Sequence, residues 1–163
     1  MIKSADNLLG ENKTENGCEV ITVGKPFEGI KFGFRETCFG ITKVGNKYLF
    51  TQKNAELSMV GGGVEAGETH AETLKREYLE ESGFKVKDVK HFIDVDAYWI
   101  AGRETTFPMR SLAHIYLVEC EDEHESPTEE NHKPVLLTID EAYSALQLPY
   151  HRKAIEYYIN SLK

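Results

Sequence analysis

The chain has 163 residues, of which 40% are hydrophobic and 28% charged, and its formal net charge is −8. These values predict one globular domain that buries its own core, and the acidic charge argues against non-specific binding to a nucleic acid polymer, which needs a basic surface. Cys18, Cys38 and Cys120 are scattered without a CxxC pair, which predicts reduced thiols in a cytoplasmic protein. No run approaches the roughly 18 apolar residues of a membrane span, so we expect no membrane partner.

The N-terminal part of the chain predicts strands. We expect residues 1–17 to form a mobile leader or a loosely docked segment, and residues 18–23 to form a short strand. Residues 32–52 are rich in apolar and β-branched side chains around the pair Gly45-Asn46. They therefore predict a hairpin that turns at this pair.

A central helix is predicted after three consecutive glycines at positions 61–63, which free the backbone to turn sharply. Thr69 and Glu72 have the spacing of a capping box, so the helix should begin near Thr69. Gly83 is suited to end it in a left-handed conformation.

After this helix the pattern returns to strands, at residues 89–100 and 111–119, joined by a polar turn at 101–105. Residues 121–133 are acidic and poor in apolar side chains, which predicts a surface loop. Residues 134–138 predict a last strand.

Two helices are expected at the C-terminus. Thr138 and Glu141 form a second capping box, for a helix that continues to Leu146. Pro149 should break the chain before a final helix at residues 151–162. Strands followed by helices in this order predict an α/β fold, with helices on both sides of a mixed sheet, in a single domain over the whole chain.

The most informative segment runs from Gly62 to Phe84 and reads GGVEAGETHAETLKREYLEESGF. Glu77, Glu80 and Glu81 have the spacing i, i+3 and i+4, so a helix gathers them within an arc of about 100°. Like charges at this spacing repel one another. The cluster is best explained by a divalent cation, and oxygen ligands favour Mg²⁺, with Mn²⁺ as the alternative.

This spacing resembles the Nudix box, G-x5-E-x7-R-E-U-x-E-E-x-G-U, in which U is a bulky aliphatic residue. The chain matches every fixed letter of the box, at Gly62, Glu68, Arg76, Glu77, Glu80, Glu81 and Gly83. Tyr78 and Phe84 occupy the U positions, and this departure concerns packing and not chemistry. The resemblance implies the Nudix fold, an α/β/α sandwich in which the box forms a loop, a helix and a loop.

The resemblance also implies a hydrolase that cleaves a pyrophosphate bond with the help of Mg²⁺. By position, the metal ligands are Glu77, Glu80 and Glu81, together with a main-chain carbonyl at Gly62 or a neighbour. Arg76 is implied to pair with Glu68 and so to hold the loop against the helix. The general base is either a box glutamate or one of the acidic residues that follow the box, Glu119, Glu121, Asp122, Glu123 and Glu125.

Substrate recognition is expected outside the box. Lys53, Arg110 and Arg35 are candidates for phosphate contacts, and Trp99 for stacking on a base, although a place in the sheet core also explains Trp99. Residues 98–101 hold no proline where ADP-ribose hydrolases of the family tend to carry one.

The chain therefore looks most like a compact MutT-type enzyme that converts a nucleoside triphosphate to a monophosphate and pyrophosphate. The alternatives are a hydrolase of nucleoside diphosphate sugars or dinucleoside polyphosphates, a nucleotide-sensing Nudix domain without catalysis, and a structural interaction domain. The expected partner is a small nucleotide, bound by a monomer or a homodimer.

Overall fold

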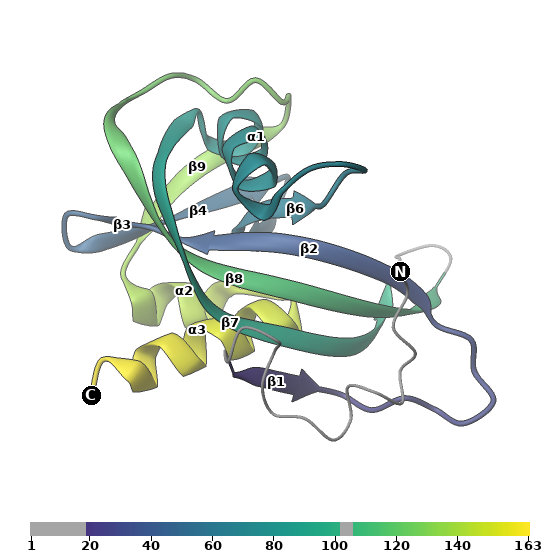
Figure 1. Ribbon diagram of the computed structural model, residues 1–163. Helices are drawn as coiled ribbons and strands as arrows, with labels where there is room; N and C mark the ends of the chain where they lie inside the picture. The colour runs from purple at the N-terminus through teal and green to yellow at the C-terminus, as the bar shows by residue number, and fades with distance from the viewer. Residues whose placement is uncertain (1–18, 102–105) are drawn as a thin grey trace.

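The computed structural model of the chain describes residues 19–101 and 106–163 (Figure 1). In chain order the elements are β1 (Val20–Val23), β2 (Gly33–Ile41), β3 (Lys43–Val44), β4 (Lys47–Lys53), β5 (Glu56–Ser58), β6 (Val60–Gly63), α1 (His70–Ser82), β7 (Phe84–Ala101), β8 (Phe107–His124), β9 (His132–Leu137), α2 (Ile139–Ala145) and α3 (Pro149–Ser161). The predicted leader at residues 1–17, Cys18 and most of the predicted turn at 101–105 lie outside the described residues.

Two sheets form the centre of the fold. The larger has the strand order β1-β7-β8-β2-β6, in which β1 with β7 and β2 with β8 are parallel and the other pairs are antiparallel. The smaller joins β3, β4, β5 and β9 by antiparallel pairing. Helix α1 packs on one side of the large sheet and α2 and α3 on the other (Figure 1). The predicted α/β/α sandwich with a mixed sheet is therefore confirmed.

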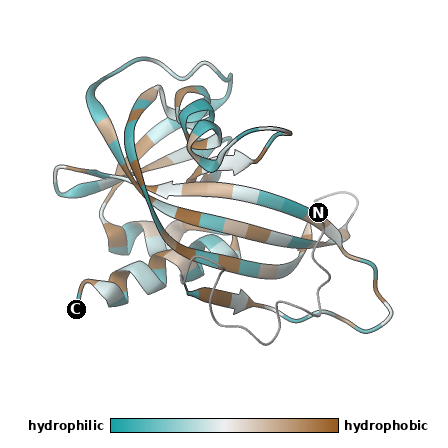
Figure 2. Cartoon of the chain, viewed as in Figure 1, coloured by the Kyte–Doolittle hydropathy of each residue, from teal (hydrophilic) through white to brown (hydrophobic). Residues whose placement is uncertain are grey.

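Alternating side chains divide the core into two clusters. On β2, Phe39 and Ile41 join Ile155 of α3 in one cluster, while Cys38 joins Leu74 of α1 in the other. Because successive side chains of a strand point to opposite faces, β2 supplies both clusters. Hydrophobic and hydrophilic bands alternate along the long strands β7 and β8 (Figure 2).

The hairpin predicted over residues 32–52 is only partly correct. Strands β3 and β4 pair across Gly45-Asn46, with Gly45 at a φ of +66°. Strand β2, however, pairs with β6 and β8 in the other sheet. Its side chains are buried on both faces from Thr37 onward, because one face packs with residues of α3 and the other with residues of α1.

Three predictions for the C-terminal part need correction. Strand β8 continues to His124 and β9 begins at His132, because both pair with neighbouring strands, so the loop is shorter than residues 121–133. Pro149 does not break the chain but begins α3, since the first turn of a helix needs no N–H donor. Thr138 caps α2, but the carboxylate of Glu141 accepts from the Thr138 hydroxyl at 2.7 Å, so the capping box is incomplete.

Among the described residues, no helix is long and apolar enough to cross a membrane.

Candidate active site

The glycine strand β6 lies so close to its neighbours that side chains would not fit at two positions. Gly61 has a φ of +148°, and a Cβ there would lie 2.0 Å from the carbonyl oxygen of Cys38. A Cβ at Gly62 would lie 2.4 Å from Glu77 Oε1. Glycine thus allows the Glu77 carboxylate to lie directly against the backbone of β6.

The ends of α1 fix where its carboxylates stand. The Thr69 hydroxyl accepts from the N–H of Glu72, and the Glu72 carboxylate accepts from the N–H of Thr69. At the other end Gly83 has a φ of +75°, and its N–H donates to carbonyls of the last turn. The predicted capping box and the predicted C-terminal glycine are both confirmed.

Arg76 connects the loop before α1 to the helix. Its Nε and Nη2 donate to the two oxygens of Glu68 at 2.7 and 2.9 Å, and Nη2 also donates to the carbonyl of Gly63 at 3.0 Å. Nη1 donates to Glu77 Oε1 at 2.9 Å. These hydrogen bonds from Arg76 lower the pKa of the Glu68 carboxyl to about 2. The structure contains the Arg76–Glu68 pair that the motif implies.

We call Glu77, Glu80 and Glu81 the acidic cluster. Glu81 is only 5% exposed, and its Oε1 accepts from the N–H of Gly61 at 3.0 Å. Burial, aided by the charge of Glu77 and opposed by the Gly61 hydrogen bond, raises the pKa of the Glu81 carboxyl to about 9. Burial and the charge of Glu77 also raise the pKa of Glu80. Glutamates gathered around one buried carboxyl in this way fit a site that a cation completes, and their oxygens match a hard divalent ion.

Two residues that follow β8 approach the acidic cluster, and sequence reasoning missed both. The N–H of Glu129 donates to the carbonyl of Glu80 at 2.9 Å, and its Oε2 lies 3.4 Å from His132 Nε2. His132 Nδ1 lies 3.3 Å from Glu81 Oε2. The acidic character of residues 121–133 was a signal, but it did not distinguish one carboxylate from another.

The acidic residues that the sequence predicted as candidate general bases lie on the last part of β8 or directly after it. Glu119 pairs with Lys87 at 3.6 Å, and Glu125 pairs with Lys85 at 3.3 Å. Both carboxylates thus face lysines of β7. Glu121, Asp122 and Glu123 are exposed on the same strand.

Arg35 and Trp99 lie on the face of the large sheet that α3 covers. The guanidinium of Arg35 passes over Gly63, because a Cβ there would lie 3.1 Å from its Nη2. Trp99 Nε1 donates to Ser111 Oγ at 2.9 Å, and its ring lies 5.8 Å from the ring of Tyr150 on α3. Arg35 therefore connects this face to the glycine strand.

Arg110 and Lys53 have different surroundings. Arg110 is 5% exposed and donates to both oxygens of Asp96 at 2.9 and 3.0 Å, between the rings of Phe34 and Tyr98. The charge of Arg110 is thus neutralised by Asp96 in a buried ion pair. Lys53 is exposed at the end of β4, opposite the backbone of His132 on β9.

The two aromatic residues of the motif have local explanations. Tyr78 is fully buried, and its hydroxyl hydrogen-bonds with Thr42 Oγ1 at 2.8 Å. Gly40 makes room for it, because a Cβ there would lie 2.0 Å from the Tyr78 hydroxyl. Phe84 stacks on His124 with ring centroids 4.4 Å apart. Neither ring displaces a member of the acidic cluster.

Comparison with protein families agrees with this geometry. The model of the NUDIX domain matches residues 37–159, which cover the glycine strand, α1 and the later elements as far as the last turn of α3. The chain belongs to the NUDIX family. The predicted Nudix membership is therefore confirmed, and it supports a pyrophosphohydrolase that acts on nucleoside diphosphate-linked substrates. Nudix hydrolases generally use divalent metal ions.

Solved structures share the Nudix fold. A NUDIX hydrolase from Nitrosomonas europaea matches with a TM-score of 0.63 and 18% identity, over 78% of this chain and 89% of that one. A MutT NUDIX hydrolase from Burkholderia pseudomallei matches with a TM-score of 0.58 and 19% identity, over 76% and 96%. A MutT protein from Bacillus halodurans matches with a TM-score of 0.55 and 22% identity, over 75% and 80%. Among curated protein sequences, none matches the chain significantly.

Proposed function

We propose that this Nudix chain uses Mg²⁺ to hydrolyse a nucleoside triphosphate to a nucleoside monophosphate and pyrophosphate. The observation that carries the proposal is the position of Glu77 and Glu81, which lie against the consecutive glycines Gly62 and Gly61 of β6. The acidic net charge argues against a nucleic acid polymer as partner, and the scattered cysteines support a cytoplasmic location.

The acidic cluster and the carbonyl of Gly62 would hold the metal. Glu77 and Glu81 are one helical turn apart and form the inner pair, while the side chain of Glu80 is 37% exposed and suits an outer ligand. A bound divalent ion supplies neutralising charge for the phosphate oxygens and lowers the pKa of the attacking water. Oxygen ligands favour Mg²⁺, and Mn²⁺ is the alternative.

Arg76 and Glu68 are proposed to position these ligands. Arg76 donates to Glu68 in the loop, to Gly63 on β6 and to Glu77 on the helix, so one guanidinium fixes three segments of the site. A planar guanidinium holds this geometry better than a lysine would. Glycine at position 62 leaves room for the Glu77 carboxylate against β6.

Glu129 is our candidate for the proton acceptor. It is tied to α1 by its backbone hydrogen bond to Glu80, and its carboxylate lies within 3.4 Å of His132. His132 in turn lies beside Glu81, so the pair connects the acidic cluster to the loop after β8. A carboxylate next to an imidazole is a suitable acceptor for the proton of the attacking water.

Substrate contacts are proposed for Arg35, Lys53 and Trp99. Arg35 and Lys53 are exposed cations suited to phosphates, whereas the buried pair with Asp96 removes Arg110 from this role. Trp99 lies beside Tyr150 on the face that also carries Arg35, which supports a stacking surface for a base.

The experiment is a substrate panel of common and oxidised nucleoside triphosphates, ADP-ribose, a sugar nucleotide and a diadenosine polyphosphate. Phosphate and pyrophosphate release is measured with and without Mg²⁺, for the natural chain and for Glu81→Gln. We expect pyrophosphate release from a triphosphate that needs Mg²⁺ and is lost in the variant. Preference for a sugar nucleotide or a dinucleoside polyphosphate would replace the proposed substrate but keep the site.

A thermal-shift measurement separates hydrolysis from sensing. A Nudix domain that only senses nucleotides would be stabilised by a nucleotide with Mg²⁺ but would release no product. An interaction domain without a nucleotide site would show neither effect.

A further inference from the structure

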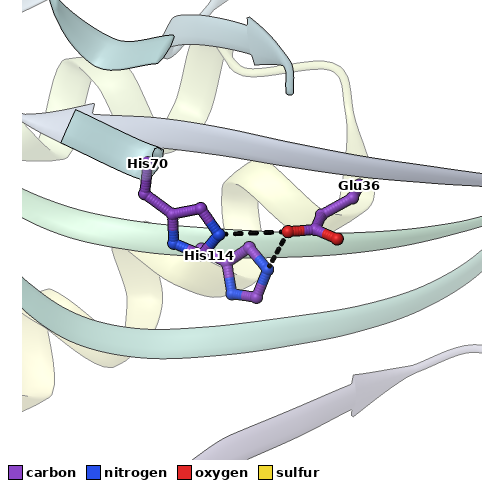
Figure 3. Close-up of side chains that lie close together, drawn as sticks. All are labelled: Glu36, His70 and His114. Carbon is purple, nitrogen blue, oxygen red and sulfur yellow. Dashed lines mark hydrogen bonds and ion pairs between the residues drawn. The ribbon is translucent and has the colours of Figure 1, made fainter. Parts of the chain in front are cut away.

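Three side chains from distant parts of the chain meet on the α1 side of the large sheet. Glu36 comes from β2, His70 is the first residue of α1, and His114 comes from β8 (Figure 3). His70 Nε2 and His114 Nε2 lie 3.0 and 3.2 Å from the same oxygen, Glu36 Oε1. We call these residues the histidine cluster. None of them belongs to the acidic cluster or to the fixed letters of the Nudix box.

The second ring nitrogen of each histidine has a hydrogen-bond partner on the side away from Glu36. His114 Nδ1 lies 2.8 Å from Asp94 Oδ1, and His70 Nδ1 lies 2.7 Å from the hydroxyl of Tyr116. Partners of this kind orient histidines that bind metals, because a carboxylate or hydroxyl on one nitrogen fixes the ring and directs the other nitrogen to the ion.

The hydrogen-bonding requirements at Glu36 point to a cation between the three groups. A carboxylate oxygen of Asp94 can only accept, so His114 Nδ1 carries a proton, and a neutral ring then has a lone pair on Nε2. That lone pair faces the Glu36 oxygen, which is also an acceptor. Either a second proton or a metal ion must lie between them. The His70 and His114 rings stack at 4.2 Å, so two imidazolium ions would repel each other, whereas one metal ion would serve the Nε2 atoms of both rings.

We propose that Glu36, His70 and His114 bind a transition metal ion, with Zn²⁺ as the best match. Zn²⁺ takes imidazole nitrogen and carboxylate oxygen at about 2.0–2.1 Å, which places neighbouring ligands of a tetrahedron about 3.3 Å apart. The distances of 3.0 and 3.2 Å are close to this value. The Glu36 side chain is 41% exposed, so a water molecule has access to the fourth position.

An overlapping group, His91, Asp94 and His114, fits a metal less well. His91 Nε2 and His114 Nδ1 lie 2.7 and 2.8 Å from Asp94 Oδ1. These are the lengths of charge-assisted hydrogen bonds and are shorter than the separation of two zinc ligands. We therefore interpret Asp94 as the hydrogen-bond partner that orients His114, and not as a metal ligand.

The bound ion would tie α1 to the sheet. Glu36 also accepts, through its carbonyl, a hydrogen bond from the N–H of Val64 at 3.0 Å, and His70 begins α1. The histidine cluster thus holds both ends of the loop that joins β6 to α1. Because the acidic cluster offers only oxygen and the histidine cluster two nitrogens, excess Mg²⁺ should fill the first and leave the second to Zn²⁺.

The test is calorimetric titration of the full chain with Zn²⁺ in the presence of excess Mg²⁺, repeated with Co²⁺ and visible absorption to report the ligand geometry. We expect one Zn²⁺ per chain and an increase in Tm with Zn²⁺. His70→Gln and Glu36→Gln should each weaken binding at least about tenfold and abolish the Tm increase. Asp94→Asn should weaken it by roughly 10- to 100-fold, as loss of a partner behind a ligand does.

His124→Gln is the matched control, because His124 is exposed on β8 and stacks on Phe84 away from the cluster. It should bind Zn²⁺ like the natural chain. His70 is the first choice for substitution because its side chain is 31% exposed, and circular dichroism verifies the fold of each variant.

Two results would overturn the proposal. Zn²⁺ binding unchanged in His70→Gln and Glu36→Gln would exclude these ligands, and binding lost in His91→Gln but retained in His70→Gln would assign the ion to the overlapping group. Neither result depends on turnover, so the proposal stands or fails separately from the proposed hydrolase function.

Discussion

The acidic cluster and the histidine cluster differ in how the chain assembles them. All three members of the acidic cluster come from α1, and the glycines they approach precede the helix by a short loop. The histidine cluster combines β2, α1 and β8, and Glu36 and His114 are 78 positions apart. A site built on one helix leaves a readable spacing in the sequence, whereas a site built across a sheet does not.

The clusters also differ in how their charge is balanced. Arg76 neutralises Glu68 and contacts Glu77, but Glu81 is buried with a raised pKa. In the histidine cluster each imidazole has its own hydrogen-bond partner on the far side. The first arrangement presents carboxylate oxygens, which we propose bind a hard cation, and the second presents oriented ring nitrogens, which we propose bind a softer one.

The largest expected effect comes from Glu77→Gln, which removes an oxygen charge at the centre of the acidic cluster. We expect kcat with Mg²⁺ to fall at least about a hundredfold, because loss of one electrostatic group in a reaction centre has effects of this size. Steady-state kinetics on the preferred substrate measure it. Glu65→Gln is the matched control, since Glu65 belongs to the same motif but its side chain is 68% exposed. An equal fall in kcat in both variants would show that Glu77 has no special role among the acidic residues of the motif.

Gly62→Ala tests whether the glycine strand serves the acidic cluster. The added Cβ would meet the flexible Glu77 carboxylate at 2.4 Å, so the carboxylate must move while the backbone remains. We expect kcat to fall by roughly ten- to a hundredfold, because misplacement by about 1 Å has effects of this order, with little change in Tm. Gly61→Ala should instead lower Tm strongly, because its Cβ would meet backbone at 2.0 Å. A large Tm loss in Gly62→Ala would contradict the assigned role.

Glu129→Gln tests the proposed proton acceptor. Because its backbone hydrogen bond to Glu80 is retained, the loop should keep its position. We expect kcat to fall by about 10²-fold with KM nearly constant, together with loss of one limb of the pH–rate profile. Glu130→Gln, at the exposed neighbouring position, should have no such effect. An unchanged pH profile in Glu129→Gln would assign the base elsewhere.

His151 provides a contrast to the histidine cluster and affects stability alone. It is fully buried, its Nδ1 accepts from the N–H of Met59 at 3.2 Å, and burial lowers its pKa to about 3 from 6.5. Below pH 6.5 the imidazole of His151 is therefore protonated in the unfolded chain but stays neutral in the folded chain. The contribution of His151 to the free energy of unfolding is fully present above pH 6.5. It decreases by about 1.4 kcal/mol for each pH unit as the pH falls toward 3.

His151→Gln should remove this acid-dependent loss, because glutamine still offers an acceptor to Met59 but does not titrate in this range. Urea unfolding between pH 7 and pH 5 of the two proteins measures the difference in slope. Parallel slopes would show that His151 does not stay neutral in the folded chain.

Much of the active-site region was predictable because its determinants are local. The capping box at Thr69, the left-handed Gly83 and the Arg76–Glu68 pair all depend on spacings of a few residues. Glu129 and His132 were not predictable, because the loop after β8 brings them to α1 only through the pairing of β9 with β4. The ion pair of Arg110 was not predictable for a similar reason, since its partner Asp96 faces it from the neighbouring strand.

The sequence by itself determined the Nudix motif, its helix and the acidic cluster, because caps, glycines and i, i+3, i+4 spacings act within one segment. Only the tertiary structure decided that β2 lies at the centre of the large sheet, that Arg110 is used by a buried ion pair, and that Glu36, His70 and His114 meet. Strand pairing sets these contacts, and it joins residues whose distance along the chain carries no record of their distance in space.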